Sequence, residues 1–237
     1  MICFITAIAG KDDSKYQQYL RPSIPENAIS IVVGGDGSIA EKYNKGILNY
    51  KKLPNRTDKD IICFVHDDVK IVDKYFEKKL EMFFNEYETH YEDVALAGVI
   101  GTLAIGEGCF WWEKMEYTKG TIVQYYKNSN RPPNQSKTAE MNTVSQVLSV
   151  DGLAMFVPVK HIDNIKFDES YGGYHFYDLD TCIDLANKNL RVFVLNIMVE
   201  HYSEGDSPVS PSFLKSRQHF IDKYKFDKFP IKVRQKK

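Results

Sequence analysis

Residues 61–69 of this 237-residue chain read Ile-Ile-Cys-Phe-Val-His-Asp-Asp-Val, an apolar run that ends in an imidazole and two carboxylates. Five consecutive apolar residues are too few for a helix of their own and predict a buried strand. Adjacent carboxylates at a strand end are costly to bury unless a cation or hydrogen-bond donors satisfy them. His66, Asp67 and Asp68 therefore predict a divalent-metal and nucleotide site, with a solvated acidic turn as the alternative.

A second dense stretch spans residues 167–180, where acids, glycines and aromatic rings lead into a helix predicted over residues 181–189. Asp178 and Asp180 fall near the N-terminus of that helix, where backbone N–H groups stabilise ionised carboxylates. Helix capping explains one of the two acids, but it does not explain the whole aromatic and acidic run. This stretch is the second candidate for a functional site.

Three further segments carry candidate residues. His201 lies at the end of a strand predicted over residues 191–199 and is a candidate metal ligand or phosphate contact, although a lone histidine is usually structural. Trp111 and Trp112 are adjacent and could form a floor on which a sugar acceptor stacks, with ordinary packing of at least one ring as the alternative. Asp151 lies at a bend between two strand segments, where it either faces the site or shapes the turn.

A glycine-rich turn separates a strand predicted over residues 28–33 from a helix predicted over residues 39–50. The turn contains Gly35-x-Gly37-x-x-Ala40, which satisfies the loose dinucleotide fingerprint, but a match at three positions after the second strand is weak evidence. Asp36 is the more informative residue if it contacts a base or ribose. The alternative is that Asp36 and Ser38 cap the following helix.

The elements that must position these residues alternate between strand and helix, which predicts an α/β fold with a mostly parallel central sheet flanked by helices. We expect a single domain over residues 1–237, with a nucleotide-binding half over about 1–104, an acceptor half over about 105–207 and a C-terminal helical segment over about 208–237. The remaining predicted elements are strands over residues 2–9, 94–101 and 147–159 and helices over residues 14–20, 72–87 and 212–224.

Composition restricts the partners and the compartment. The chain has 31 Lys and Arg against 32 Asp and Glu, so it has no global basic field to attract nucleic acid, and we expect no nucleic-acid partner. The four cysteines show neither CxxC pairing nor zinc spacing, which is typical of a reducing compartment. No apolar run approaches the roughly 20 residues needed to span a bilayer. With no basic n-region at the N-terminus, we expect a cytoplasmic protein.

Taken together, these stretches resemble the GT-A glycosyltransferases, closest to glycosyltransferase family 2 and its bacterial relatives with a His-Asp-Asp signature. The resemblance runs from Ile2 to about Gly205. The departures are Gly35, His66 and Tyr177, each of which stands where the family has an acid. The matching motifs are Gly35–Ser38 for the Asp-Asp-Gly-Ser nucleotide loop, Tyr43–Ile47 for the Asn-x-Gly helix, Phe64–Asp68 for the D-x-D strand end and Tyr177–Cys182 for the Glu-Asp-x-Asp-Leu-Cys motif.

The resemblance implies a GT-A fold and a metal-dependent glycosyltransferase of the hexosyltransferase type, which moves a sugar from a nucleotide-diphosphate donor to a hydroxyl acceptor. It implies an inverting reaction with Asp178 as the general base, and a Mn²⁺ or Mg²⁺ cofactor, of which imidazole ligation favours Mn²⁺. The implied contacts are Ala7, Asp36 and Asp67 for the nucleotide sugar, Asp68 and His201 for the metal, and Trp111, Trp112, Asp151 and Asp180 for the acceptor.

The family also implies a glycan or lipid-linked glycan acceptor and a role in bacterial polysaccharide biosynthesis. That role would place the protein at the inner face of the cell membrane, with the basic tail (Lys232, Arg234, Lys236 and Lys237) as a peripheral contact. The departures keep a catalytically degenerate carbohydrate-binding or assembly subunit open as an alternative. A nucleotidyltransferase or an oxidoreductase is less favoured, because it would need a glycine fingerprint after the first strand or a phosphate loop rich in Lys and Arg.

Overall fold

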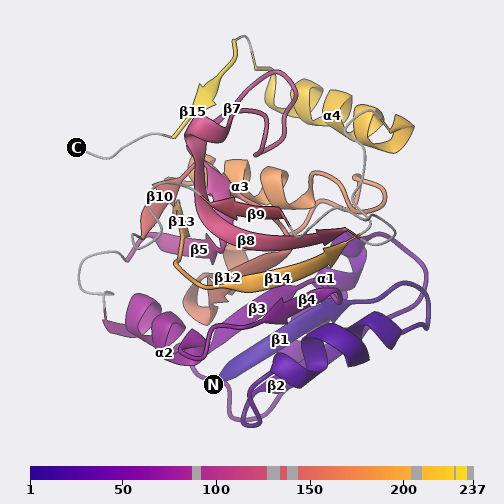
Figure 1. Ribbon diagram of the computed structural model, residues 1–237, viewed down its shortest axis with the longest axis vertical. Coiled ribbons are helices and arrows are strands. Elements are labelled where there is room, and N and C mark those ends of the chain that lie inside the picture. Colours follow the sequence, from indigo (N-terminus) through magenta and orange to yellow (C-terminus); the bar gives the residue numbers. More distant parts are fainter. Residues whose placement is uncertain (87–91, 127–133, 138–143, 204–209, 227, 234–237) are drawn as a thin grey trace.

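The computed structural model describes residues 1–86, 92–126, 134–137, 144–203, 210–226 and 228–233. A seven-stranded sheet in the order β10-β13-β5-β12-β3-β1-β2 forms its centre (Figure 1). The strands of this central sheet are β1 (Ile2–Ala7), β2 (Ile29–Val33), β3 (Ile61–Val65), β5 (Val94–Gly98), β10 (Ser145–Val147), β12 (Ala154–Pro158) and β13 (Arg191–Val194).

The central sheet is mostly parallel, as the sequence predicts: five of its seven strands, β1, β2, β3, β5 and β13, run in the same direction. Strand β1 runs parallel to β2 and β3, and β13 runs parallel to β5. Strand β12 is antiparallel to both β3 and β5, and β10 is antiparallel to β13. The first residue of β12, Ala154, pairs with the last residue of β3, Val65. The chain therefore enters β12 from the carboxyl end of β3 and must run in the opposite direction.

A second sheet was not predicted from the sequence. Each of the three long strands predicted over residues 94–101, 147–159 and 191–199 is divided by a break. In the first and third of them the chain passes from the central sheet to the second one, and between residues 147 and 159 it enters the second sheet and then returns to the central one. Strands β7 (Ala104–Ile105) and β15 (Ile231–Lys232) form a separate pair. The second sheet consists of β4 (Val69–Ile71), β6 (Ile100–Thr102), β8 (Thr118–Tyr126), β9 (Asn134–Lys137), β11 (Ser149–Val150) and β14 (Val199–Ser203).

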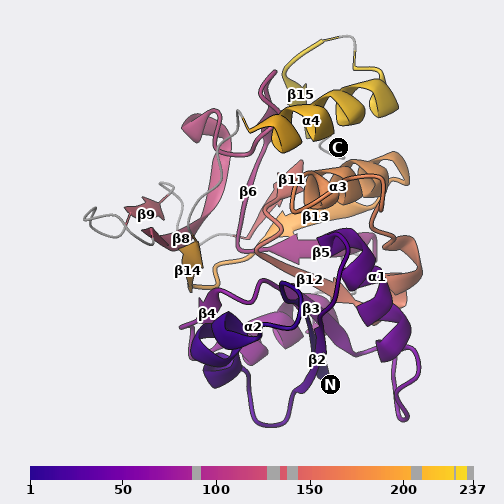
Figure 2. The same cartoon turned by 90° about the vertical axis from the view of Figure 1, so that its right-hand side faces the viewer.

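Both faces of the central sheet are covered, which explains why its inner strands β1, β3, β5 and β12 are buried along their whole length. Alternate residues of β3 point to opposite faces: Cys63 belongs to the core cluster that contains α2 residues, whereas Phe64 belongs to the cluster that contains α1 and α3 residues. Figure 2 shows α1 and α3 on one side of the central sheet and α2 on the other. The helices are α1 (Ile39–Tyr50), α2 (Phe76–Glu81), α3 (Tyr177–Asn187) and α4 (Pro211–Tyr224), with single turns η1 (Tyr16–Leu20), η2 (Arg21–Ser23), η3 (Met82–Glu86), η5 (Met115–Tyr117) and η6 (Val159–Asn164).

Helix α1 begins and ends where the sequence predicts, at residues 39 and 50. The Ser38 hydroxyl accepts a hydrogen bond from the Glu41 N–H, and the Glu41 carboxylate accepts one from the Ser38 N–H. This reciprocal capping box satisfies two N–H groups at the start of the helix. Ser38 is therefore the residue that caps α1.

Helix α4 packs outside α3 through an aromatic cluster that includes Phe176, Phe213 and Phe220. Figures 1 and 2 show α4 at the end of the molecule that lies farthest from the N-terminus. Within the described residues, no helix is both long enough and apolar enough to cross a membrane. Of the basic tail, only Lys232 is described; Arg234, Lys236 and Lys237 lie outside the described residues.

Candidate active site

A cavity of about 610 Å³ opens at the carboxyl ends of β1 and β3. It gathers eight of the ten residues that the sequence singled out: Ala7, Asp67, Asp68, Trp111, Trp112, Asp151, Asp178 and His201. It also gathers His66, which the sequence places at the predicted metal and nucleotide site, and residues with no predicted contact, including Asp12, Lys15, Tyr174, His175 and Tyr177.

Strand pairing explains why segments far apart in the chain meet at this cavity. The antiparallel pairing of β14 with β4 places His201 opposite Val69. The Tyr202 N–H donates a hydrogen bond of 2.8 Å to the Asp68 carbonyl oxygen, which fixes the two strands at this point. The His66 N–H donates one of 3.0 Å to the Leu153 carbonyl oxygen, so the end of β3 lies beside the bend at Asp151.

Asp68 and His201 form the centre of a candidate metal site. The Asp68 side chain is 10% exposed, and its Oδ1 accepts no hydrogen bond although His201 Nε2 lies 3.3 Å away. His201 Nδ1 lies 2.9 Å from the Gln124 carboxamide oxygen, which can only accept, so Nδ1 donates this hydrogen bond, and in the neutral form of the ring that metal ligation requires it carries the only proton. A lone pair on Nε2 then faces the carboxylate oxygen. A cation between these two atoms would satisfy both.

His66 is the third member of this group. One nitrogen or oxygen atom from each of His66, Asp68 and His201 lies within 4.8 Å of the others. His66 Nε2 lies 2.6 Å from the Tyr177 hydroxyl. If His66 donates its Nε2–H to this hydroxyl, its lone pair is on Nδ1, and a neighbour that fixes the tautomer in this way is typical of a metal-ligating histidine. The three residues therefore fit a divalent ion that accepts both nitrogen and oxygen ligands, such as Mn²⁺.

The electrostatics of these residues agree with a cation site. Burial lowers the pKa of His66 and keeps its ring neutral, as metal ligation requires. Burial alone would raise the pKa of Asp68, but the contact with His201 and the positive charge of Lys15 hold that pKa below its usual range. Burial, followed by the charge of Asp68, raises the pKa of Asp67 to about 6. Asp68 is thus the anionic ligand. A positive charge added beside Asp67 would stabilise its ionised form and lower its raised pKa.

Asp178 lies on another wall of the cavity, in the first turn of α3. Its two carboxylate oxygens accept hydrogen bonds of 2.8 Å from the N–H groups of Gly152 and Leu179. Burial, followed by the charge of Asp151, raises the pKa of Asp178 to about 7, and the two hydrogen bonds only partly oppose this. A general base works best when its pKa lies near the working pH, and Asp178 meets that condition.

The residue before α3, Phe176, sets the direction from which Asp178 enters the cavity. Its backbone is left-handed, with φ 65° and ψ −7°, a conformation that residues other than glycine rarely adopt. The Phe176 ring packs 5.2 Å from the ring of Phe213 and 5.4 Å from that of Phe220, both on α4. Helix α4 therefore helps to hold the start of α3, and with it the Asp178 carboxylate, in place.

The two tryptophans do not form the common stacking floor that the sequence suggested. Their rings lie 5.2 Å apart at 78° to each other, so they cannot share one plane. Trp111 packs against the central core and donates its Nε1–H to the Asp151 carboxylate, whereas Trp112 is 41% exposed. Of the two rings that line the cavity, Trp112 is the more exposed, and Trp111 positions Asp151.

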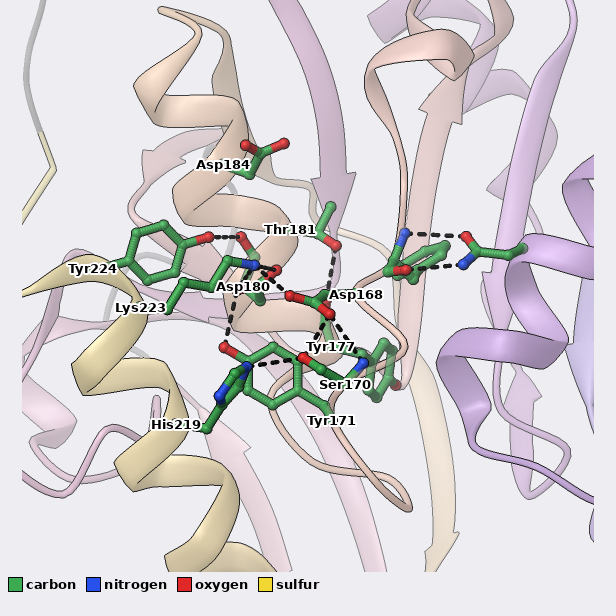
Figure 3. Close-up of polar contacts among 12 residues, drawn as sticks. Asp168, Ser170, Tyr171, Tyr177, Asp180, Thr181, Asp184, His219, Lys223 and Tyr224 are labelled. Atoms are coloured by element: carbon green, nitrogen blue, oxygen red, sulfur yellow. Dashed lines mark hydrogen bonds and ion pairs between the residues drawn. The ribbon is translucent and has the colours of Figure 1, made fainter.

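Asp180 was predicted to contact the acceptor, but the structure places it outside the cavity. Its side chain is 3% exposed and points toward α4 (Figure 3). Both of its oxygens lie within 2.9 Å of Lys223 Nζ, and the Tyr171 hydroxyl donates a third hydrogen bond of 3.0 Å. Residues two apart on a helix do not share a face, so Asp178 and Asp180 cannot both enter the cavity.

Substitution of Lys223 by methionine should lower the free energy of unfolding by about 3 kcal/mol, because it leaves the Asp180 carboxylate buried without its partner. Urea unfolding followed by circular dichroism measures this change. Lys215→Met, at an exposed position on the same helix, is the matched control and should stay close to the parent protein. Equal stability of the two variants would show that the ion pair does not hold α4 on α3.

Asp36 is the second predicted residue that the cavity does not gather. It is exposed at the turn before α1, where Gly35 and Gly37 adopt φ values of 101° and 106°. The structure thus leaves the recognition of a nucleotide base without an assigned carboxylate. The polar residues after β1, Asp12 and Lys15, line the cavity instead. Both residues follow the carboxyl end of β1, where ligands bind in α/β sheets, and this position in the sequence could have marked them as candidate site residues.

The chain is similar in sequence to a known family and in fold to solved structures. A family model described as "Glycosyltransferase like family" matches residues 6–224. No curated protein matches the sequence. Among solved structures, the protein A197 from STIV superposes with a TM-score of 0.51 at 14% identity, over 85% of each chain. GalNAc-T7, solved with UDP, GalNAc and Mn²⁺, superposes with a TM-score of 0.55 at 7% identity, over 95% of this chain and 49% of that one. This chain thus spans about half of GalNAc-T7.

Proposed function

This chain belongs to the glycosyltransferase-like family and has a GT-A fold, and from that premise we propose that it transfers a sugar from a nucleotide-diphosphate donor to a hydroxyl acceptor with inversion. One observation carries the proposal: a single cavity has a candidate metal group on one wall and, on another, a carboxylate whose pKa is raised to about 7. The proposed acceptor is a glycan or a lipid-linked glycan.

The donor half of the site comprises Ala7, Asp67 and the metal group His66, Asp68 and His201. A bound divalent ion would supply positive charge to the departing diphosphate. That this site holds Mn²⁺ is our proposal, supported by its two imidazoles and by the Mn²⁺ in the GalNAc-T7 structure. Asp67, which lines the cavity beside Asp68, is proposed to contact the ribose or the ion.

The acceptor half comprises Asp178, Asp151 and Trp112. Asp178 takes the proton from the acceptor hydroxyl, whose oxygen then forms a bond to the anomeric carbon as the bond to the diphosphate breaks. Asp151 is held by Trp111 and by the Leu153 N–H, and its charge keeps the proton affinity of Asp178 high. Trp112 offers an exposed ring for stacking on the acceptor sugar.

The pH dependence of transfer should show this base directly. Asp178 accepts a proton only as the carboxylate, so below its pKa of about 7 the rate should rise about tenfold per pH unit, and it should level off above that pH. Asp151→Asn removes the charge that raises this pKa and should move the midpoint to lower pH. Rates at saturating substrate between pH 5 and about 9 measure both. Asp184→Asn, on the same helix outside the cavity, is the control and should keep the parent midpoint.

A screen of sugar nucleotides with Mn²⁺ tests the proposed function. Ligands that bind the native state raise its unfolding temperature by mass action, so thermal shift identifies the donor. Each donor that binds is then assayed for metal-dependent release of its nucleotide diphosphate, first to water and then to glycan acceptors. Stabilisation by one donor class together with metal-dependent turnover supports the proposal. Failure of every sugar nucleotide to bind would contradict it.

A carbohydrate-binding or assembly subunit without catalytic activity is the second candidate. The position of Asp36 outside the cavity favours it, because base recognition is then weaker than the family motif implies. The same screen separates the two functions. Binding of a sugar nucleotide with neither hydrolysis nor transfer would favour the non-catalytic candidate.

A further inference from the structure

Lys15 supplies a positive charge to the cavity. Among the described residues, it is the only lysine or arginine that lines this cavity. Its Nζ lies 3.2 Å from Asp68 Oδ2, and its side chain is 36% exposed. The other oxygen of that carboxylate, Oδ1, faces His201. Asp68 thus lies between the lysine and the imidazole that would share a metal ion with it.

The backbone of Lys15 is anchored to the metal side of the cavity. Lys15 directly precedes η1, in which Tyr16 is 4% exposed and Leu20 is fully buried. The Tyr19 ring stacks 4.2 Å from that of Tyr202, the residue after His201. The segment therefore keeps its place relative to β14, and only the long side chain of Lys15 has freedom to change its contact.

The charge balance of the proposed reaction favours a positive group here in addition to the metal ion. As the bond between the anomeric carbon and the donor oxygen breaks, the electron pair stays on the diphosphate, which leaves with one more negative charge. The acceptor proton passes to Asp178. The cavity walls already carry Asp12, Asp67 and Asp68 near the donor side. An additional negative charge there is unfavourable unless fixed positive groups oppose it.

We propose that Lys15 is a diphosphate-binding catalytic residue that exchanges partners during the reaction. Its ammonium group pairs with Asp68 before the donor enters. When Asp68 becomes a ligand of a divalent ion, the Lys15 side chain turns to form an ion pair with the donor diphosphate. This inference rests on the proposed function. Lys15 therefore opposes metal binding in the absence of donor, and it strengthens donor binding and departure of the diphosphate once the metal is present.

Calorimetry with Mn²⁺ alone and with inorganic pyrophosphate in excess Mn²⁺ tests this exchange without a known donor. Lys15→Met should bind Mn²⁺ alone about two- to fivefold more tightly, because a competing ion pair is removed. It should bind pyrophosphate about tenfold more weakly or worse, because a charge-assisted contact is lost. Lys15→Arg keeps the charge and should retain most of the pyrophosphate affinity. The matched control is Lys59→Met, exposed before β3 at the end opposite His66. Thermal unfolding confirms that each variant is folded.

The two effects of opposite sign separate this role from a structural one. Weaker binding of both Mn²⁺ and pyrophosphate by Lys15→Met would show that the lysine only maintains the site and would overturn the inference. Unchanged pyrophosphate affinity would overturn it as well, while leaving the proposed transferase function in place. If the parent protein binds neither Mn²⁺ nor pyrophosphate, the metal-dependent function fails and the role of Lys15 fails with it.

Discussion

Substitution of Asp178 by asparagine is expected to lower the rate of sugar transfer by about 10²–10⁴-fold, while the affinity for the donor stays within a factor of about two of the parent value. The amide keeps the size of the side chain and can still accept a hydrogen bond from the Gly152 or Leu179 N–H. It cannot take a proton from the acceptor hydroxyl. The loss should therefore appear in the chemical step and not in binding.

Single-turnover transfer measures the chemical step, and calorimetry with the donor and Mn²⁺ measures binding. Asp184→Asn is the matched control because Asp184 lies on α3, away from the cavity, with a side chain that is 44% exposed. It should transfer at the parent rate. Normal turnover by Asp178→Asn would remove Asp178 as the base, and the other carboxylate of that wall, Asp151, would become the next candidate.

Substitution of Asp68 by asparagine should abolish the dependence of donor binding on Mn²⁺. Loss of groups that only support a metal ligand typically costs 10–100-fold in metal affinity, and loss of the anionic ligand itself should cost at least about 100-fold. Asp68 is the only carboxylate in a group whose other two members are imidazoles, so the amide leaves no anion among the three. The effect should be larger than that of a change at either histidine.

A titration of Mn²⁺ followed by electron paramagnetic resonance measures the affinity without any need for activity. Asp58→Asn, at an exposed position before β3 and far from the cavity, is the matched control and should bind Mn²⁺ as the parent does. Tight Mn²⁺ binding by Asp68→Asn would show that the ion lies elsewhere. The group His66, Asp68 and His201 would then have to be abandoned as the metal site.

The sequence predicts the ends of the central strands well, because their buried runs are interrupted where polar side chains begin. The run 61–65 stops at His66, and that boundary correctly locates one wall of the cavity. The second sheet could not be predicted in this way. Apolar residues continue through the breaks at Val99 and Leu148, so hydrophobicity alone shows no transfer of the chain from one sheet to another.

In the candidate site, likewise, local geometry predicts the position of some residues, whereas the position of others depends on tertiary contacts. Asp178 and Asp180 differ because successive helix residues rotate by about 100°, and helical geometry alone could have assigned one of them to the outer face. Trp111 and Trp112 are indistinguishable in sequence, and they differ only in tertiary contacts: Trp111 packs against the core and bonds to Asp151, whereas Trp112 is exposed. Lys15 reaches Asp68 across 53 residues of sequence, and no local pattern predicts that contact.

The packing of Phe176 against α4 also has a consequence for protein synthesis. The left-handed turn before α3 is held by Phe213 and Phe220, and Asp180 is paired with Lys223, so both supports come from residues translated after the whole central sheet. A nascent chain released as far as residue 203 already contains every residue of the cavity except Phe213. It still lacks the helix that orients Asp178. The residues of the proposed metal group should therefore come together before α4 has left the ribosome, and the proposed base, Asp178, should be aligned only after α4 has packed.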